Sequence, residues 1–195
     1  MATVLLFHHV LGLTDGVRDL AERLRAGGHD VYTPDLYAGR TFTTMPDAFA
    51  WKNSDDAPDA TALADAAASE LLAAGPVVMV GISMGVMQAQ RLAQTRDGVA
   101  GAVLLEACVP VTGEWAFGPW PGGVPVQVHG MDDDEFFAHE GDLDAARELV
   151  AGAPGGEVFT YPGDAHLFCD SALATYDGAA TDLVVERVLA LLSAV

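Results

Sequence analysis

The chain has 195 residues, a length that suits one domain and is tight for two. Hydrophobic residues make up 51% of it, which favours a packed globule over a disordered chain. The formal net charge is −19, from 28 acidic against 9 basic residues, and such a surface repels phosphate backbones and anionic lipids. We therefore expect a single domain over residues 1–195, with no nucleic acid and no membrane partner.

Cysteine content and the first residues bear on where the protein works. Cys108 and Cys169 are too few for a secreted disulfide framework, and no Cys-x-x-Cys motif occurs. Residues 1–7 lack the basic start of a signal peptide and have the apolar continuity of a buried strand. No apolar run approaches the roughly 20 residues of a membrane span. The expectation is a cytoplasmic protein, either a monomer or a homodimer.

Strands and helices are predicted to alternate along the chain. The predicted strands are 3–7, 31–33, 76–80, 101–105, 124–129 and 157–161. The predicted helices are 17–26, 60–74, 84–93, 142–150 and 176–192. Residues 36–56 are predicted to be an irregular excursion over one end of the sheet, and residues 110–123 a loop rich in Gly, Pro and Trp. The alternation predicts a three-layer α/β/α sandwich with a mostly parallel central sheet of about six to seven strands.

Ligands of such sheets bind beyond the carboxyl ends of the strands. The pentapeptide Gly81-Ile82-Ser83-Met84-Gly85 lies there, between a predicted strand and a predicted helix. A nucleophile on so sharp a turn has a strained backbone, and flanking glycines remove the Cβ atoms that would crowd it. The turn exposes the hydroxyl and directs the helix N-terminus toward developing negative charge. The alternative is a plain strand–turn–helix with a capping serine, and the setting favours the nucleophile.

A serine hydroxyl needs a base, usually an oriented histidine. His166 follows the last predicted strand, on a loop that can carry its imidazole over the strand ends. The acid that orients it is expected among Asp132, Asp133 and Asp134, which point in different directions and which the pattern alone does not separate. Glu106, at the end of another predicted strand, is a fallback acid.

Two further hypotheses concern the surroundings of these residues. A metal site built from the acidic run with His129 and His139 is the rival interpretation, but the spacing fits neither an EF-hand nor a zinc motif, so no metal is expected. Aromatic side chains of the two irregular segments are predicted either to line an apolar pocket or merely to pack the loops, and both interpretations are equally supported. They are Phe42, Phe49, Trp51, Trp115, Phe117 and Trp120.

Several stretches, in order, resemble the dienelactone hydrolase family over nearly the whole chain. They are His8–Leu13, Pro34–Tyr37, Gly81–Gly85, Pro125–Gly130 with the acidic run, Gly163–Phe168 and Tyr176-Asp177. The resemblance implies an α/β-hydrolase fold, no cofactor, and a small-molecule ester or lactone as substrate. The family's acid, three residues after the glycine of its loop, corresponds to Asp133. Its oxyanion hole corresponds to the backbone N–H groups of Val10 and Met84.

Three positions depart from that pattern. The founding enzymes carry cysteine at the position of Ser83, and a glutamate coupled to it at the position of His9. A serine has no low-pKa thiolate to manage, so the glutamate's partner is gone. Where those enzymes hold a substrate carboxylate with an arginine, this chain has Asp170. We therefore expect a neutral or cationic ester rather than dienelactone itself.

The sequence thus predicts a serine hydrolase that works through an acyl-enzyme. Ser83 is the nucleophile, His166 the base, and Asp133 the acid that orients it. The candidate pocket residues are His9, Trp51, Trp115 and Phe168, with the role of His9 left open. Acyl transfer or thioesterase chemistry on the same three residues is a second hypothesis, favoured if the aromatic loops exclude water. A non-catalytic, ligand-binding member of the fold is a third.

Overall fold

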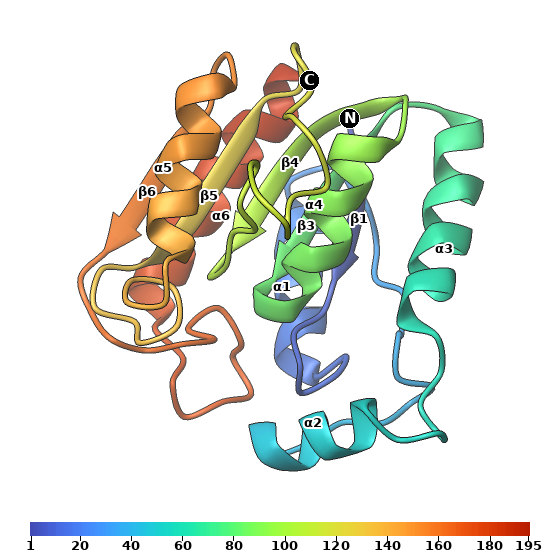
Figure 1. The fold of residues 1–195 in the computed structure, drawn as a ribbon, viewed down its shortest axis with the longest axis vertical. Coiled ribbons are helices and arrows are strands. Elements are labelled where there is room, and N and C mark those ends of the chain that lie inside the picture. Colours follow the sequence, from blue (N-terminus) through green and yellow to red (C-terminus); the bar gives the residue numbers. More distant parts are fainter.

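A computed structural model describes residues 1–195, and its centre is one six-stranded sheet (Figure 1). The strands are β1 Thr3–Phe7, β2 Asp30–Tyr32, β3 Val77–Ile82, β4 Val99–Leu105, β5 Val126–Met131 and β6 Glu157–Tyr161. The helices are α1 Asp15–Ala26, α2 Met45–Lys52, α3 Ala60–Ala74, α4 Val86–Thr95, α5 Asp142–Gly152 and α6 Gly178–Ala194. Every neighbouring pair of strands is parallel, in the order β2-β1-β3-β4-β5-β6.

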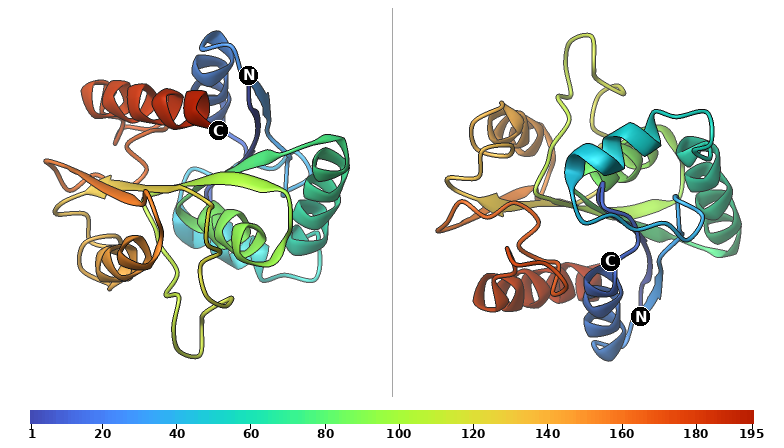
Figure 2. Two further views of the ribbon diagram at one scale, coloured as in Figure 1. Left: turned by 90° about the horizontal axis from the view of Figure 1, so that it is seen from above. Right: turned by 90° about the horizontal axis from the view of Figure 1, so that it is seen from below.

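The sheet divides the core into two apolar layers because successive side chains of a strand point to opposite faces. In β1, Val4 and Leu6 belong to one buried cluster, while Leu5 and Phe7 belong to the other. Helices α1 and α6 cover the first face, and α3, α4 and α5 cover the second (Figure 2). A strand buried on both faces has to be apolar throughout, which is why β1 and β3 read as unbroken apolar runs. The predicted three-layer α/β/α sandwich is confirmed.

The end of the strand before Ser83 differs from the prediction, and this difference affects the position of the serine. Strand β3 continues to Ile82, two residues beyond the predicted end, so Ser83 follows the strand directly. The chain leaves β1 for β2 on one side and returns to β3 on the other. This reversal opens a crevice between the carboxyl ends of β1 and β3, the usual ligand position in open parallel sheets.

The prediction of an irregular segment over residues 36–56 is wrong in part, because it contains helix α2. The hydroxyl of Thr44 accepts a hydrogen bond from the backbone N–H of Asp47, and Pro46 occupies the first turn. Both are signals for a helix start, present in the sequence but unaccompanied by a clear apolar stripe. Helix α2 lies beyond the carboxyl edge of the sheet, at the bottom of Figure 1.

The long connection between β4 and β5 contains no helix or strand, as predicted for residues 110–123. Figure 2 shows it standing away from the sheet on the side of α4 and α5. Together with α2 it borders the carboxyl edge, where the candidate residues gather. No helix of the fold is both long enough and apolar enough to cross a lipid bilayer.

Candidate active site

Ser83 lies on a tight turn that requires glycine two residues before it and two residues after it. A single 3₁₀ turn, Ser83–Gly85, joins β3 to α4, and Ser83 adopts a left-handed backbone with φ of 49°. A Cβ atom on Gly81 would lie 2.5 Å from the carbonyl oxygen of Gly85, and one on Gly85 would lie 2.4 Å from that of Phe7. Real Cβ atoms do not approach so closely, so both glycines are sterically required. The predicted strained turn is confirmed, and it holds the hydroxyl above the sheet.

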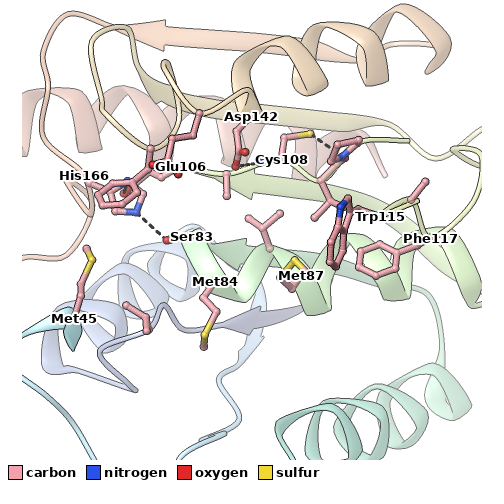
Figure 3. A pocket seen from close by; sticks show the side chains of 18 of the residues that line it. Met45, Ser83, Met84, Met87, Glu106, Cys108, Trp115, Phe117, Asp142 and His166 are labelled. Carbon is pink, nitrogen blue, oxygen red and sulfur yellow. Dashed lines mark hydrogen bonds and ion pairs between the residues drawn. The ribbon is translucent and has the colours of Figure 1, made fainter. Parts of the chain in front are cut away.

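The hydroxyl of Ser83 begins a chain of three hydrogen-bonded side chains, and Figure 3 shows its first link, from Ser83 to His166. Its Oγ lies 2.8 Å from Nε2 of His166, and Nδ1 of His166 lies 2.7 Å from Oδ2 of Asp134. A carboxylate only accepts hydrogen bonds, so Nδ1 carries the proton and Nε2 is free to accept the serine proton. Burial alone would lower the pKa of His166, but the hydrogen bond that its ring donates to Asp134 and the nearby carboxylate charges outweigh burial and raise that pKa.

The acid beside His166 is Asp134, which corrects the choice of Asp133. The backbone N–H of Asp132 donates to Tyr161, and that of Asp133 donates to Gly163, so both residues still run alongside the β6 segment. Their side chains accordingly point outward: that of Asp133 is 74% exposed and bonds to His139. The chain turns inward only at Asp134, which is fully buried.

Glu106, the fallback acid, also reaches the histidine. It follows β4 directly, is fully buried, and its Oε2 lies 4.0 Å from Nδ1 of His166. The same oxygen accepts a hydrogen bond from the backbone N–H of Leu167. The shorter distance makes Asp134 the direct partner of the ring, and Glu106 a second carboxylate behind it.

The expected oxyanion donors lie next to the serine. Val10 and Met84 line the same pocket as Ser83, and the N–H of Val10 bonds to no other backbone group. Val10 lies after β1, and Met84 is the second residue of the turn after β3. Two N–H groups near a hydroxyl can stabilise negative charge that develops on a bound carbonyl oxygen.

These groups open into a pocket of about 640 Å³. Its lining is mostly apolar and comes from α2, the β4–β5 connection and the turn after β5. Phe136 packs against the ring of His166 at a centroid distance of 4.7 Å. Trp115 and Phe117 lie at the end of the pocket away from His166 (Figure 3). The volume suits a small organic molecule.

Of the four predicted pocket residues, only Trp115 lines this pocket. Trp51 packs instead against Tyr37 and Phe42, with ring centroids 4.9 Å and 5.5 Å away. Phe168 is fully buried in the core under α6. The six aromatic side chains were predicted either to line a pocket or to pack the loops, and each interpretation holds for some of them. Those that line the pocket are Phe49, Trp115 and Phe117. Those that do not are Phe42, Trp51 and Trp120.

His9 is fully buried and does not line the pocket either. Its Nε2 lies 2.7 Å from Oδ2 of Asp170, and its Nδ1 accepts from the backbone N–H of Leu11. The ring is therefore neutral, with its proton on Nε2. Thr14 donates to the same carboxylate oxygen at 2.5 Å. Burial raises the pKa of Asp170, but the bonds from His9 and Thr14 outweigh it and lower that pKa. Two departures from the family pattern thus form one buried contact.

The charge of the lining has a single sign. The pocket is bordered by four carboxylates and by no lysine or arginine. They are Glu106, Glu114, Glu140 and Asp142. The basic side chains that form ion pairs do so elsewhere, as Arg91 does with Asp65 and Arg147 with Asp144. An anion entering this pocket would therefore meet repulsion without compensation.

The histidines of the rival metal interpretation lie apart. His129 is fully buried within β5, where it bonds to the hydroxyl of Tyr161, and burial lowers its pKa to about 3. His139 is exposed and bonds to Asp133. No group of three or more His, Cys, Asp or Glu side chains is arranged to hold a metal ion.

The parallel sheet, the serine turn and the pocket at the strand ends define an α/β-hydrolase fold, and solved structures agree. The chain aligns over its full length with P91, a dienelactone hydrolase-like promiscuous phosphotriesterase from metagenomic libraries (TM-score 0.73, 18% identity, 86% of that chain). It aligns over the same full length with a lipolytic enzyme of the metagenome-derived pair LipS and LipT (TM-score 0.70, 20% identity, 94% of that chain). It also aligns over its full length with an esterase from Pyrobaculum calidifontis (0.70, 16%, 76%).

The profile of the Dienelactone hydrolase family matches residues 1–195, so the chain belongs to that family. Family membership makes it an enzyme of the hydrolase class. No curated protein matches the chain closely enough to serve as a relative.

Proposed function

We propose that this hydrolase cleaves small carboxylic esters or lactones through an acyl-enzyme on Ser83. The observation that carries the proposal is the hydrogen-bonded array Ser83–His166–Asp134, set at the strand ends inside an apolar pocket. A serine hydroxyl is a weak nucleophile unless a base takes its proton as it attacks. The array supplies that base, and the buried carboxylate holds its tautomer and stabilises the imidazolium.

The reaction begins when Ser83 Oγ attacks the carbonyl carbon and its proton passes to Nε2 of His166. The carbonyl oxygen becomes an oxyanion, which the N–H groups of Val10 and Met84 stabilise. The intermediate collapses, the C–O bond to the alcohol breaks, and His166 returns the proton to the leaving oxygen. Water then attacks the acyl-enzyme, gives its proton to His166, and releases the acid as Ser83 is restored. With a lactone, the alcohol and the acid leave as one hydroxy acid.

The proposal is tested by activity and labelling together. The wild-type enzyme is incubated with short p-nitrophenyl esters, aliphatic lactones and a thioester, and separately with a serine-directed fluorophosphonate. We expect ester or lactone hydrolysis and one adduct, located on Ser83 by peptide mass spectrometry. Cys108 also lines the pocket, but burial raises the pKa of its thiol and its Sγ bonds to the carbonyl of Val109. Absence of both turnover and label, or an adduct at another residue, contradicts the proposal.

The charge of the pocket predicts which esters are preferred. Three esters of equal size are compared: a choline ester, its neutral 3,3-dimethylbutyl isostere, and a monoester that carries a carboxylate. We expect kcat/KM for the anionic ester to be at least about tenfold below both others, since a cleft of one sign changes local substrate concentration by about 10–10³-fold. The difference should shrink in about 1 M salt, where the Debye length is about 3 Å.

A pair of variants localises this effect. Glu140→Gln removes a charge from the lining and is expected to reduce the ratio of kcat/KM between the neutral ester and the anionic ester. Glu148→Gln removes an equal charge from α5 outside the pocket, where the side chain accepts from Thr112, and is expected to leave it unchanged. An anionic ester that is hydrolysed as fast as its neutral counterpart contradicts the predicted selectivity.

A further inference from the structure

Glu106 has an unfavourable backbone conformation and an unfavourable side-chain environment. It is not a glycine, yet its φ is 66°, in the left-handed region. Its side chain is fully buried, and Oε1 has no hydrogen-bond partner. A left-handed backbone is strained at a residue other than glycine, and burying a carboxylate without a cation is unfavourable as well. No lysine or arginine faces it to offset this cost.

The contacts of Glu106 converge on the histidine loop. Oε2 accepts from the backbone N–H of Leu167, the residue directly after His166. Leu167 itself has a φ of 62°, so the loop bends sharply where Glu106 holds it. The same Oε2 lies 4.0 Å from Nδ1 of His166. The ring is therefore flanked by two carboxylates, Asp134 from the end of β5 and Glu106 from the end of β4.

We propose that Glu106 is a positioning residue for His166: it fixes the loop through Leu167 and keeps a negative charge beside the imidazole as the ring becomes protonated. The inference rests on the proposed function, because it assigns Glu106 a part in the proton transfer from Ser83. Although Glu106 borders the pocket, its contacts are with Leu167 and His166, so its proposed part in the reaction is exerted through the histidine.

The titratable groups that face Glu106 come from two elements. His166 and Cys169 face it from the histidine loop, and Asp134 from the loop after β5; Asp142, at the start of α5, faces His166. Burial raises the pKa of Glu106 to about 7, although the charge of His166 and the Leu167 N–H both pull it down. Glu106 is therefore ionised above about pH 7, where the proposed reaction needs a neutral and basic imidazole.

The Glu106→Gln variant keeps the shape and an acceptor for Leu167 but removes the charge. Since a nearby negative charge raises the pKa of a histidine, its loss should move the acid limb of kcat/KM about one unit toward lower pH. The plateau kcat should fall about three- to tenfold, because a less basic imidazole is a weaker general base. Glu106→Asp retains the charge and should return the acid limb toward the wild-type position. Glu186→Gln, exposed on α6, is the matched control.

A second readout does not depend on turnover. The His166 ring is titrated by NMR in histidine-labelled wild type, Glu106→Gln and Glu186→Gln, with its signal assigned by its loss in His166→Gln. We expect a lower His166 pKa in Glu106→Gln alone. If Glu106→Gln does not fold, Glu106→Asp decides, because its shorter side chain holds the charge farther from the imidazole and should lower the His166 pKa below the wild-type value.

The failures are distinguishable. A wild type that neither hydrolyses esters nor takes the phosphonate label contradicts the proposed function, while the NMR titration still reports on Glu106. The inference is overturned if the wild type is active but Glu106→Gln matches it in two quantities. These are the pKa of the acid limb of kcat/KM and the His166 pKa from NMR, each within about 0.2 units of the wild-type value. Where Glu106→Asp is the variant that folds, a His166 pKa equal to that of the wild type overturns it as well.

Discussion

Replacing Ser83 by alanine is expected to lower kcat for ester hydrolysis by about 10⁶-fold, the size of loss found when a serine nucleophile is deleted from such an array. The reason is that His166 and Asp134 have no other hydroxyl to activate in the pocket. Alanine keeps the Cβ atom and tolerates the left-handed backbone as serine does, so the fold should be unaffected. The residual rate would reflect the N–H groups of Val10 and Met84 and binding alone.

Steady-state kinetics and phosphonate labelling of the purified variant provide the measurement, with thermal unfolding as the check on folding. Ser193→Ala is the matched control, because this serine lies on α6 and bonds only to the carbonyl of Leu189. The control should keep wild-type kcat. If Ser83→Ala keeps it too, Ser83 is not the nucleophile and the proposed mechanism fails.

The second large effect concerns the acid. Asp134→Asn is expected to lower kcat by about 10⁴-fold, because an amide beside Nδ1 permits the wrong imidazole tautomer. With its proton on Nε2, His166 cannot accept the proton of Ser83. The change preserves side-chain volume and leaves an oxygen that can accept from the N–H of Phe136, so the turn after β5 should persist.

Asp133→Asn is the decisive comparison, since it makes the same change one residue earlier. The side chain of Asp133 is exposed and bonds only to His139, so loss of its charge should alter kcat by less than about twofold, as for most surface substitutions. Asp132→Asn should likewise be mild, because the amide oxygen can still accept from Gly163. A larger loss at Asp132 or Asp133 than at Asp134 would show that another carboxylate serves His166.

Sequence periodicity was enough to predict the layers and the sheet. Apolar runs alternating with helical patterns place Ser83 and His166 after strands, and parallel strands bring these ends to one edge. The glycines around Ser83 could be interpreted because their effect is local: a Cβ atom either fits the turn or does not. Helix α2 was missed although Thr44 and Pro46 signal its start, because a short helix over an edge lacks a clear apolar stripe.

The identity of the triad acid and of the pocket-lining residues depends on contacts between distant parts of the chain, which no local sequence pattern contains. Whether Asp133 or Asp134 points inward is decided by how far pairing with the β6 segment continues, a contact across 30 residues of chain. The same holds for the aromatics: Trp51 turns toward Tyr37 and Trp115 toward the pocket, and both lie in segments of similar composition. Glu106 was recognised as a carboxylate at a strand end, but its link to Leu167 required the folded loop.

The contact between His9 and Asp170 couples two positions that are 161 residues apart in the chain. Placing a glutamate at position 9 alone would set two carboxylates against each other in the dry interior, and placing an arginine at position 170 alone would bury a cation against the ring. Neither single change is tolerable in isolation, so the two sites form one epistatic unit. A route from this chain to a carboxylate-binding relative therefore has to alter both positions together.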